Sequence, residues 1–174
     1  MKPHIYLIAT LLLLSCRQNA PGPASVQSID CLYADAAPPP PAGAITPDSL
    51  VAFAQTLLGK PYSFGCSSPS TGFDCSGFIG YVFAHFGITV PRSSVDFTNQ
   101  GTEIPLSAAR PGDLILFTGT NASIRTVGHI GMVVARDSAG TRFIHSSSGR
   151  EDAVIITTLD DRYMRRFVKV IRML

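Results

Sequence analysis

One cysteine and two histidines have the residue types and the spacing that nucleophilic catalysis requires. Cys75 stands in a glycine-rich stretch and opens a segment whose apolar residues recur at helical spacing. In the first turn of a helix, unpaired N–H groups and the positive end of the helix dipole favour a thiolate over a thiol. The alternative is a small buried residue, because a free cysteine often belongs to a core. Two glycines and a serine leave little apolar bulk around Cys75, which favours the nucleophile.

The base for such a thiolate must come from the histidines. His85 follows Cys75 by ten residues on the same expected helix, about 15 Å away, and is too distant to be the partner. His129 and His145 lie on consecutive strand-like segments, which a turn centred at residue 137 would pair as a hairpin. The two side chains are then near cross-strand partners on one face, close enough for one imidazole to orient the other. Either histidine alone is typical of a hydrogen-bonded strand residue, but both together with Cys75 favour catalysis.

The elements that position these residues are helices first and strands afterwards. Thr46 as N-cap, Pro47 at the first helical position and Gly59 after the last turn bracket a helix. The Cys75 helix and a short helix at about 93–100 come next. Strand-like runs follow at hairpin spacing, at 113–117, 129–135, 142–146, 154–158 and 167–173. This order predicts an α+β fold with an antiparallel sheet.

The first 45 residues have a different character. The apolar run at 5–14 is too short to span a bilayer and has the length of a signal-peptide core. It ends at Leu13-Leu14-Ser15-Cys16, which resembles the bacterial lipobox and implies a mature chain that begins at lipid-modified Cys16. An ordinary signal peptide with a chance cysteine, or a buried strand, is the alternative. We therefore expect a signal peptide at 1–15, a Pro/Ala-rich tether at 16–45 and a folded domain at 46–174.

Composition narrows the classes of function. A chain of 174 residues, 45% hydrophobic and 15% charged, is large and apolar enough to form one domain with its own hydrophobic core. A net charge of +2 without a Lys/Arg block gives no reason to expect nucleic acid. The four cysteines lack metal-ligand spacing, so a structural zinc site is not expected. Hydrolysis by a cysteine and a histidine needs no metal or organic cofactor. Cys31 and Cys66 are candidates for a disulfide, but spacing does not decide the pairing.

Six ordered motifs between about residues 48 and 172 are similar to those of the NlpC-type cell-wall endopeptidases. They begin at Gly59, Gly72, Val90, Arg110, Gly128 and Ile144. The resemblance implies a papain-like fold, with N-terminal helices packed on a five- to six-stranded antiparallel sheet. It implies Cys75 as nucleophile, His129 as base and His145 as the third polar residue, which orients His129.

The same resemblance implies a substrate and further site residues. Peptidoglycan stem peptides would be cleaved at a bond involving D-glutamate or a diamino acid. Tyr62 matches the family tyrosine near the oxyanion site, while Asp74 and Ser76 match substrate-contacting neighbours of the nucleophile. Cys66 stands where the motif commonly has a second glycine.

We expect a monomer in the bacterial envelope, held at a membrane by its lipid and facing the periplasm or the wall. An acyltransferase or amidase on the same scaffold, and a catalytically silent wall-binding module, are the other interpretations.

Overall fold

The first helix begins where its capping residues predict. In the computed structural model, which describes residues 45–174, helix α1 spans Pro47–Gln55. The Thr46 hydroxyl accepts from the Ser49 N–H and the Ser49 hydroxyl accepts from the Thr46 N–H, each at 3.1 Å. The helix ends earlier than predicted, so that Leu58, expected on its buried stripe, is 44% exposed.

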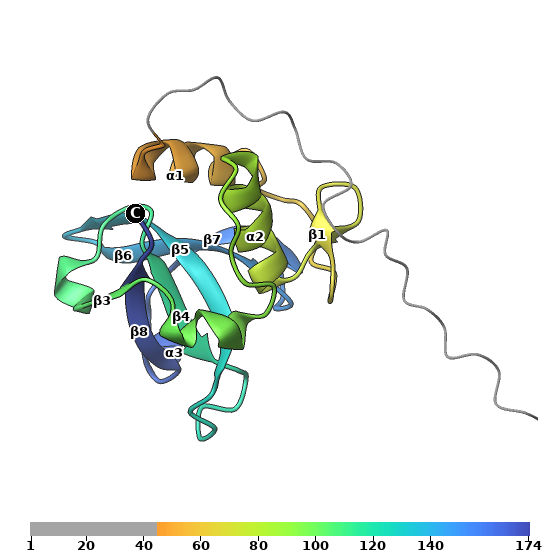
Figure 1. Cartoon of the computed structure of the whole chain (residues 1–174). Coiled ribbons are helices and arrows are strands. Elements are labelled where there is room, and N and C mark those ends of the chain that lie inside the picture. The colour runs from red at the N-terminus through yellow and green to blue at the C-terminus, as the bar shows by residue number, and fades with distance from the viewer. Residues whose placement is uncertain (1–44) are drawn as a thin grey trace, which may run out of the picture.

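Six antiparallel strands form the main sheet, in the order β3-β8-β4-β5-β6-β7 (Figure 1). Their bounds are Thr102–Ile104 for β3, Leu114–Thr118 for β4, Val127–Asp137 for β5, Gly140–Ser147 for β6, Ala153–Thr158 for β7 and Phe167–Arg172 for β8. The five strand-like runs of the sequence correspond to β4–β8, and the predicted antiparallel sheet is confirmed. The sequence does not predict β3, because three residues are too few to show the alternation of a strand.

Helix α2, Cys75–His85, is the buried helix that the sequence predicts. The N-cap residue Asp74 accepts a hydrogen bond from the Gly77 N–H through Oδ1, at 2.6 Å. Residues 76–83 are all buried. Gly87, at φ +74°, follows the last turn in the left-handed conformation that glycine tolerates. α2 contacts α1 as well as β5 and β6, so the start of α2 lies against the strands that carry the two histidines (Figure 1).

Short elements connect the larger ones. Strands β1 (Ser67–Ser68) and β2 (Gly72–Phe73) pair in the loop before α2. The predicted short helix is the 3₁₀ helix η2 (Ser94–Asn99), which a second one, η3 (Leu106–Ala108), follows after β3. Helix α3 (Asp161–Met164) lies between β7 and β8 and has only four residues, too few for a sequence period.

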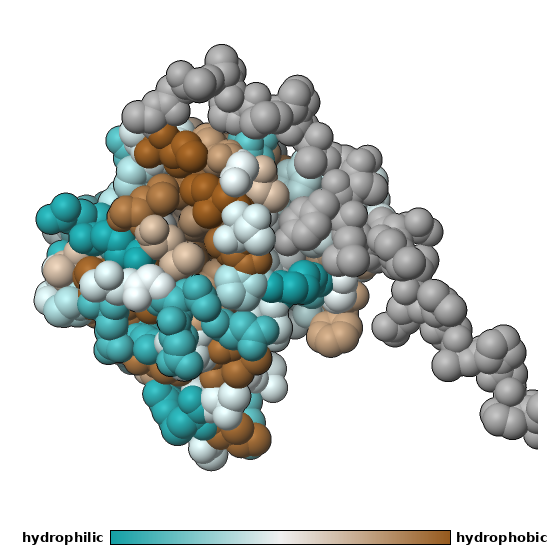
Figure 2. All heavy atoms as spheres, viewed as in Figure 1, coloured by the Kyte–Doolittle hydropathy of each residue, from teal (hydrophilic) through white to brown (hydrophobic). Residues whose placement is uncertain are grey.

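The main sheet is buried on both faces. Successive residues of β4 alternate between two apolar clusters: Leu114 and Leu116 pack with α1 and α2, whereas Ile115 and Phe117 pack on the opposite face. Tyr163 of α3 covers that second face. Because helices and loops cover both faces, all five residues of β4 are buried. Figure 2 shows further apolar side chains gathered over α1 and α2.

The hairpin of β5 and β6 has a different register from the one predicted. Asp137 pairs with Gly140, which centres the turn between 138 and 139, and the register shifts between Val133 and Ala135. On the histidine side of this shift, Met132 pairs with Ile144. His145 is therefore opposite Gly131 and not opposite His129. The two histidines remain diagonal neighbours on one face of the sheet.

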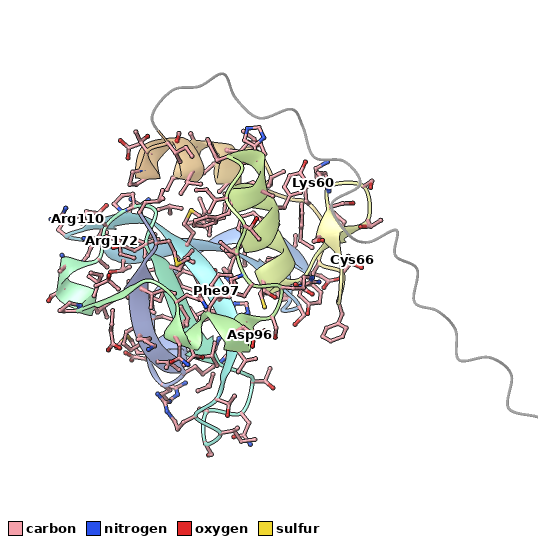
Figure 3. All side chains as sticks on the ribbon, viewed as in Figure 1. Lys60, Cys66, Asp96, Phe97, Arg110 and Arg172 are labelled. Carbon is pink, nitrogen blue, oxygen red and sulfur yellow. The ribbon has the colours of Figure 1, made fainter. Side chains whose placement is uncertain are left out.

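The chain end is held by a buried carboxylate. Asp113 accepts from Nε and Nη2 of Arg172, at 2.7 and 2.8 Å, and from the Arg110 N–H at 2.8 Å. Figure 3 shows Arg110 and Arg172 close together at this edge of the molecule. The Arg-Pro-Gly-Asp motif at 110–113 therefore fixes the end of β8 to the start of β4.

The segment before α2 carries Cys66, seen beside β1 in Figure 3. Cys66 is disulfide-bonded, and Cys75 is the free cysteine among residues 45–174. The predicted partner Cys31 and the lipidation residue Cys16 lie outside the described residues, so both predictions stay open. Among residues 45–174, no helix combines the length and the apolar character that crossing a membrane requires.

Candidate active site

A cavity of about 480 Å³ opens beside the start of α2. Cys75 of α2, His129 of β5 and Tyr62 of the loop before β1 all line it. The structure thus brings three of the predicted site residues together from three separate segments. His145 of β6 is fully buried directly behind His129.

The nucleophile candidate Cys75 is a neutral thiol in this site. Burial and the Asp74 carboxylate raise the pKa of Cys75, although backbone groups of Ile130, Ser76 and Cys75 itself act in the opposite direction. The expectation that the helix start lowers this pKa is therefore wrong for the resting site. Burial destabilises the thiolate by more than the helix N–H groups stabilise it.

The two histidines form a relay that ends on a hydroxyl. The His129 Nε2 and His145 Nδ1 atoms are 2.8 Å apart, and His145 Nε2 lies 3.0 Å from Thr157 Oγ1 of β7. For His129 to accept a proton at Nδ1, its Nε2–H must donate to His145 Nδ1. The Nε2–H of His145 then donates to Thr157, which places the whole chain in one tautomer.

Both imidazoles are neutral at rest. Burial, with the Arg166 cation as a second cause, lowers the pKa of His129 to about 3. Burial, His129 and then Arg166 and Arg162 lower the pKa of His145 well below its usual value. The site therefore begins as a thiol–imidazole pair, and proton transfer accompanies attack on a substrate.

Gly128 and Gly131, on the same strand as His129, lie where a side chain would collide with neighbouring atoms. An added Cβ at Gly128 would lie 2.8 Å from the Gly119 nitrogen, and one at Gly131 would lie 3.2 Å from the His145 Cβ. Glycine at these positions therefore lets the neighbouring backbone come close to the strand that carries His129.

Tyr62 lies between the nucleophile and the loop after β6. Its N–H donates to the Asp152 carbonyl at 2.8 Å, and it forms a bridge with Phe73 just before α2. Burial, then Cys75 and Asp74, raise the pKa of Tyr62, while the interacting Ser148 side chain lowers it. The phenol is therefore protonated and can donate a hydrogen bond into the cavity.

Asp74 and Ser76 occupy a different position from Tyr62. Asp74 binds Arg92 through both oxygens, at 2.9 Å and 2.7 Å, and its Oδ2 also accepts from the Gly65 N–H at 2.9 Å. Ser76 donates to Asp74 and accepts from Arg92, both at 3.3 Å. Both residues are buried and neither lines the cavity. Their observed contacts hold the start of α2 and the Pro91-Arg92 segment together.

His85 is excluded from the site, as its spacing predicts. It ends α2 and stacks on Phe53, with ring centroids 3.6 Å apart. In the described part of the chain, His, Cys, Asp and Glu side chains do not gather into a group that could hold a metal ion.

Sequence reasoning missed three residues at this site. Thr157 is one of two adjacent threonines, and only the register shows that it faces His145. Arg162 and Arg166 lie in an arginine-rich segment around the short helix α3, and both line the cavity. Residues 162–169 contain four arginines or lysines, and this cluster was the one sequence feature that pointed to the cavity. A run of charges is usually a solvated surface, so it did not single out these two residues.

Comparison with known proteins places this chain in a family. The model of the NlpC/P60 family matches residues 59–173. The probable endopeptidase p60 of Listeria seeligeri is 45% identical over 85 residues, 49% of this chain and 15% of that protein. The gamma-DL-glutamyl hydrolase of Bacillus subtilis is 37% identical over 120 residues, 68% of this chain and 27% of that protein.

Comparison with solved structures also points to the NlpC/P60 family. An NlpC/P60 family protein from Bacillus cereus superposes with a TM-score of 0.66 and 30% identity, covering 75% of this chain and 41% of that one. The predicted papain-like α+β fold is thereby confirmed. This chain spans less than half the length of each of these three proteins. The sequence match and the shared fold together show that the chain belongs to the NlpC/P60 family.

Proposed function

We propose that this protein is a cysteine endopeptidase that hydrolyses peptidoglycan stem peptides, at a bond involving D-glutamate or a diamino acid. The observation that carries the proposal is one cavity lined by Cys75 and His129, with His129 bonded to a buried His145. The names of the relatives, an endopeptidase and a gamma-DL-glutamyl hydrolase, support the reaction and the bond.

The mechanism depends on which nitrogen of His129 is free to take a proton. Because His129 Nε2 is bonded to His145, Nδ1 is the atom that takes the thiol proton as Cys75 attacks the scissile carbonyl. The Cys75 N–H and the Tyr62 phenol stabilise the oxyanion, a contribution of about 10²–10³ in rate per donor in other enzymes. The imidazolium then protonates the leaving amine, and water releases the acyl-enzyme. His145 and Thr157 hold the base in its working tautomer throughout.

Mass spectrometry of muropeptides digested by the purified protein tests this function. Wild-type protein should release fragments cut within the stem, and Cys75→Ser, which is nearly isosteric, should release none while its melting temperature is unchanged. Cys66→Ser, which removes a disulfide-bonded cysteine instead of the free thiol, is the comparison and should keep the catalytic activity. Loss of activity in Cys66→Ser with retention in Cys75→Ser would overturn the assignment. The same spectra distinguish hydrolysis from transfer to another acceptor.

We further propose that a lipid on Cys16 anchors this enzyme to a membrane of the bacterial envelope. On this proposal residues 1–15 are a signal peptide, 16–45 a tether and 46–174 a monomeric catalytic domain. The apolar run followed by Ser15-Cys16 supports the anchor. Metabolic labelling with a fatty acid should mark the wild-type protein and not Cys16→Ala; equal labelling of the two would exclude the anchor.

A further inference from the structure

The loop 148–152, which connects β6 to β7, is fastened to the segment that carries Tyr62. The Tyr62 N–H donates to the Asp152 carbonyl at 2.8 Å, and Pro61 forms an antiparallel bridge with Ala153 directly after the loop. These two segments are almost ninety residues apart in the chain. The position of Tyr62 in the cavity therefore depends on the conformation of the loop 148–152.

Asp152, at the end of this loop, has a left-handed backbone. Its φ is +46°, and it is the only residue other than glycine with a positive φ among residues 45–174. Its N–H donates to the Gly149 carbonyl at 3.1 Å, and the Gly149 N–H donates to the Ser147 hydroxyl at 3.2 Å, so the loop is closed by its own hydrogen bonds. A sparsely populated backbone conformation persists only where its surroundings fix it, and such residues cluster at active sites.

The closed loop places Ser148 in the active-site cavity beside Tyr62. Both residues line the cavity that also contains Cys75 and His129. The Ser148 side chain forms a hydrogen bond with the Tyr62 phenol. Burial, Cys75 and Asp74 raise the pKa of this phenol, whereas Ser148 lowers it, as a donor to the phenol oxygen does. Ser148 is therefore able to donate to the oxygen of Tyr62.

The direction of this hydrogen bond is determined once a substrate reacts. An oxyanion can only accept, so the Tyr62 O–H must donate to it, and the phenol oxygen is then free to accept from the Ser148 O–H. This arrangement turns the phenolic proton away from Ser148 and towards the reacting carbonyl. A hydroxyl that accepts one hydrogen bond also becomes a stronger donor of the next, because the bonds polarise one another.

We propose that Ser148 is a positioning residue for the oxyanion donor: its hydroxyl donates to Tyr62 and directs the phenolic proton at the carbonyl that Cys75 attacks. The inference rests on the proposed function, in which Tyr62 stabilises the oxyanion. The left-handed Asp152 supports this contact from both ends, because it closes the loop that presents Ser148 and its carbonyl binds the Tyr62 N–H. In this role Ser148 acts on the reaction through Tyr62 alone.

Steady-state hydrolysis of a purified stem peptide tests the role of Ser148. Ser148→Ala should lower kcat by about fivefold with KM unchanged, because the oxyanion exists only as the bond breaks and one hydrogen bond is lost there. Ser148→Thr keeps the hydroxyl and should retain most of the wild-type rate. Ser138→Ala makes the same change in the exposed turn between β5 and β6 and is the matched control. A rise in KM with kcat unchanged in Ser148→Ala would contradict the proposal.

A double-mutant cycle with Tyr62→Phe shows whether the effect passes through the phenol. Tyr62→Phe removes the oxygen that Ser148 binds, so adding Ser148→Ala to it should cause no further loss of the residual kcat. The two substitutions are then strongly non-additive, as expected for two groups that act as one donor. An equal loss on Ser148→Ala in the wild-type and the Tyr62→Phe backgrounds would show that Ser148 acts independently of Tyr62 and would overturn the proposal.

Titration of Tyr62 separates this inference from the proposed function, because it needs no substrate. The ultraviolet absorbance of tyrosinate, followed against pH and compared with Tyr62→Phe, isolates this residue among the five tyrosines of the chain. Ser148→Ala removes a donor that stabilises the phenolate, so Tyr62 should ionise at higher pH, and Ser148→Thr should not show this shift. An unchanged titration in Ser148→Ala would refute the positioning role even in an active enzyme. A shifted titration in a protein that cleaves no stem peptide would refute the proposed function alone.

Discussion

His129 Nε2 lies 2.8 Å from His145 Nδ1 although the two residues are not opposite each other in the β5–β6 ladder. The register places Gly131 opposite His145, and the absence of a side chain there lets the buried imidazole reach diagonally to its neighbour. The partner that orients His129 across the sheet is thus a histidine and not a carboxylate. A neutral partner leaves the base neutral as well, which suits a site that begins as thiol and imidazole.

The two histidines should differ in their tolerance of substitution. His129 carries the proton and has no substitute, so His129→Gln should remove activity almost completely. His145 supplies only an acceptor, so His145→Asn or His145→Gln should retain measurable turnover and His145→Ala less. Turnover of a purified stem peptide decides between them. An inactive His145→Asn, equal to His129→Gln, would contradict the orienting role.

Thr157→Val should slow the reaction without weakening substrate binding. The valine keeps the shape of Thr157 but cannot accept from His145, so the relay loses its preferred tautomer. The loss of one such hydrogen bond, about 1 kcal/mol, corresponds to roughly a fivefold decrease in kcat with KM unchanged. Thr158→Val, the same change on the exposed neighbour, should have no effect. A rise in KM alone would contradict this role.

Alkylation should report the raised pKa of Cys75. Burial and Asp74 raise it, so the rate with iodoacetamide should keep increasing above the pH at which an ordinary thiol, about 8.5, is half ionised. Asp74→Asn keeps a capping side chain but removes the second cause, and should shift the profile to lower pH. Asp137→Asn, an exposed site, is the control. A wild-type profile centred below about pH 8 would show that the thiolate is favoured after all.

The buried histidines should make the fold sensitive to acid. Their folded pKa values lie below the unfolded value of about 6.5, so between about pH 6.5 and 3 the unfolded chain binds more protons and stability falls as the pH falls. Urea unfolding at pH 7.5 and pH 4.5 should show this fall. It should be smaller in His145→Gln, which cannot titrate. An equal fall in both proteins would place the sensitivity elsewhere.

The pair of Arg92 and Asp74 should contribute more stability than a surface pair. Arg92→Gln leaves a mostly buried carboxylate short of two charge-assisted bonds and should cost about 2 kcal/mol in the free energy of unfolding. Arg142→Gln breaks an ion pair that is exposed on both sides and should cost under about 1 kcal/mol. Equal costs, measured by urea unfolding, would show that Asp74 is compensated by its backbone contacts alone.

The local signals of the sequence predict most of the fold. Thr46 and Gly87 mark helix ends through backbone chemistry that acts within a few residues, and the strand runs of β4–β8 reflect burial on the two faces of one sheet. The same signals predict the contact between His129 and His145 but not its register, because the bulge after Val133 leaves no mark on the hydrophobic pattern.

The parts that could not be predicted depend on contacts between distant segments. Thr157 and Arg166 reach the site through strand pairing and through the carbonyls of β4, which no local spacing encodes. The pKa of Cys75 is another example, since burial outweighs the helix start that the sequence makes visible. Local chemistry therefore indicates which residues can react, whereas the packing decides their resting protonation.

Strand β7 carries Thr157 at the edge of the main sheet, and on its outer side the segment 59–62 pairs with it: the Gly59 N–H donates to the Val154 carbonyl, and the Tyr62 N–H to the neighbouring Asp152 carbonyl. One edge strand thus holds both Tyr62, the proposed oxyanion donor, and Thr157, which bonds His145. Edge strands open at lower free energy than the centre of a sheet. Warming should therefore detach Tyr62 and Thr157 together while the core is still folded, so that activity is lost several degrees before the protein melts.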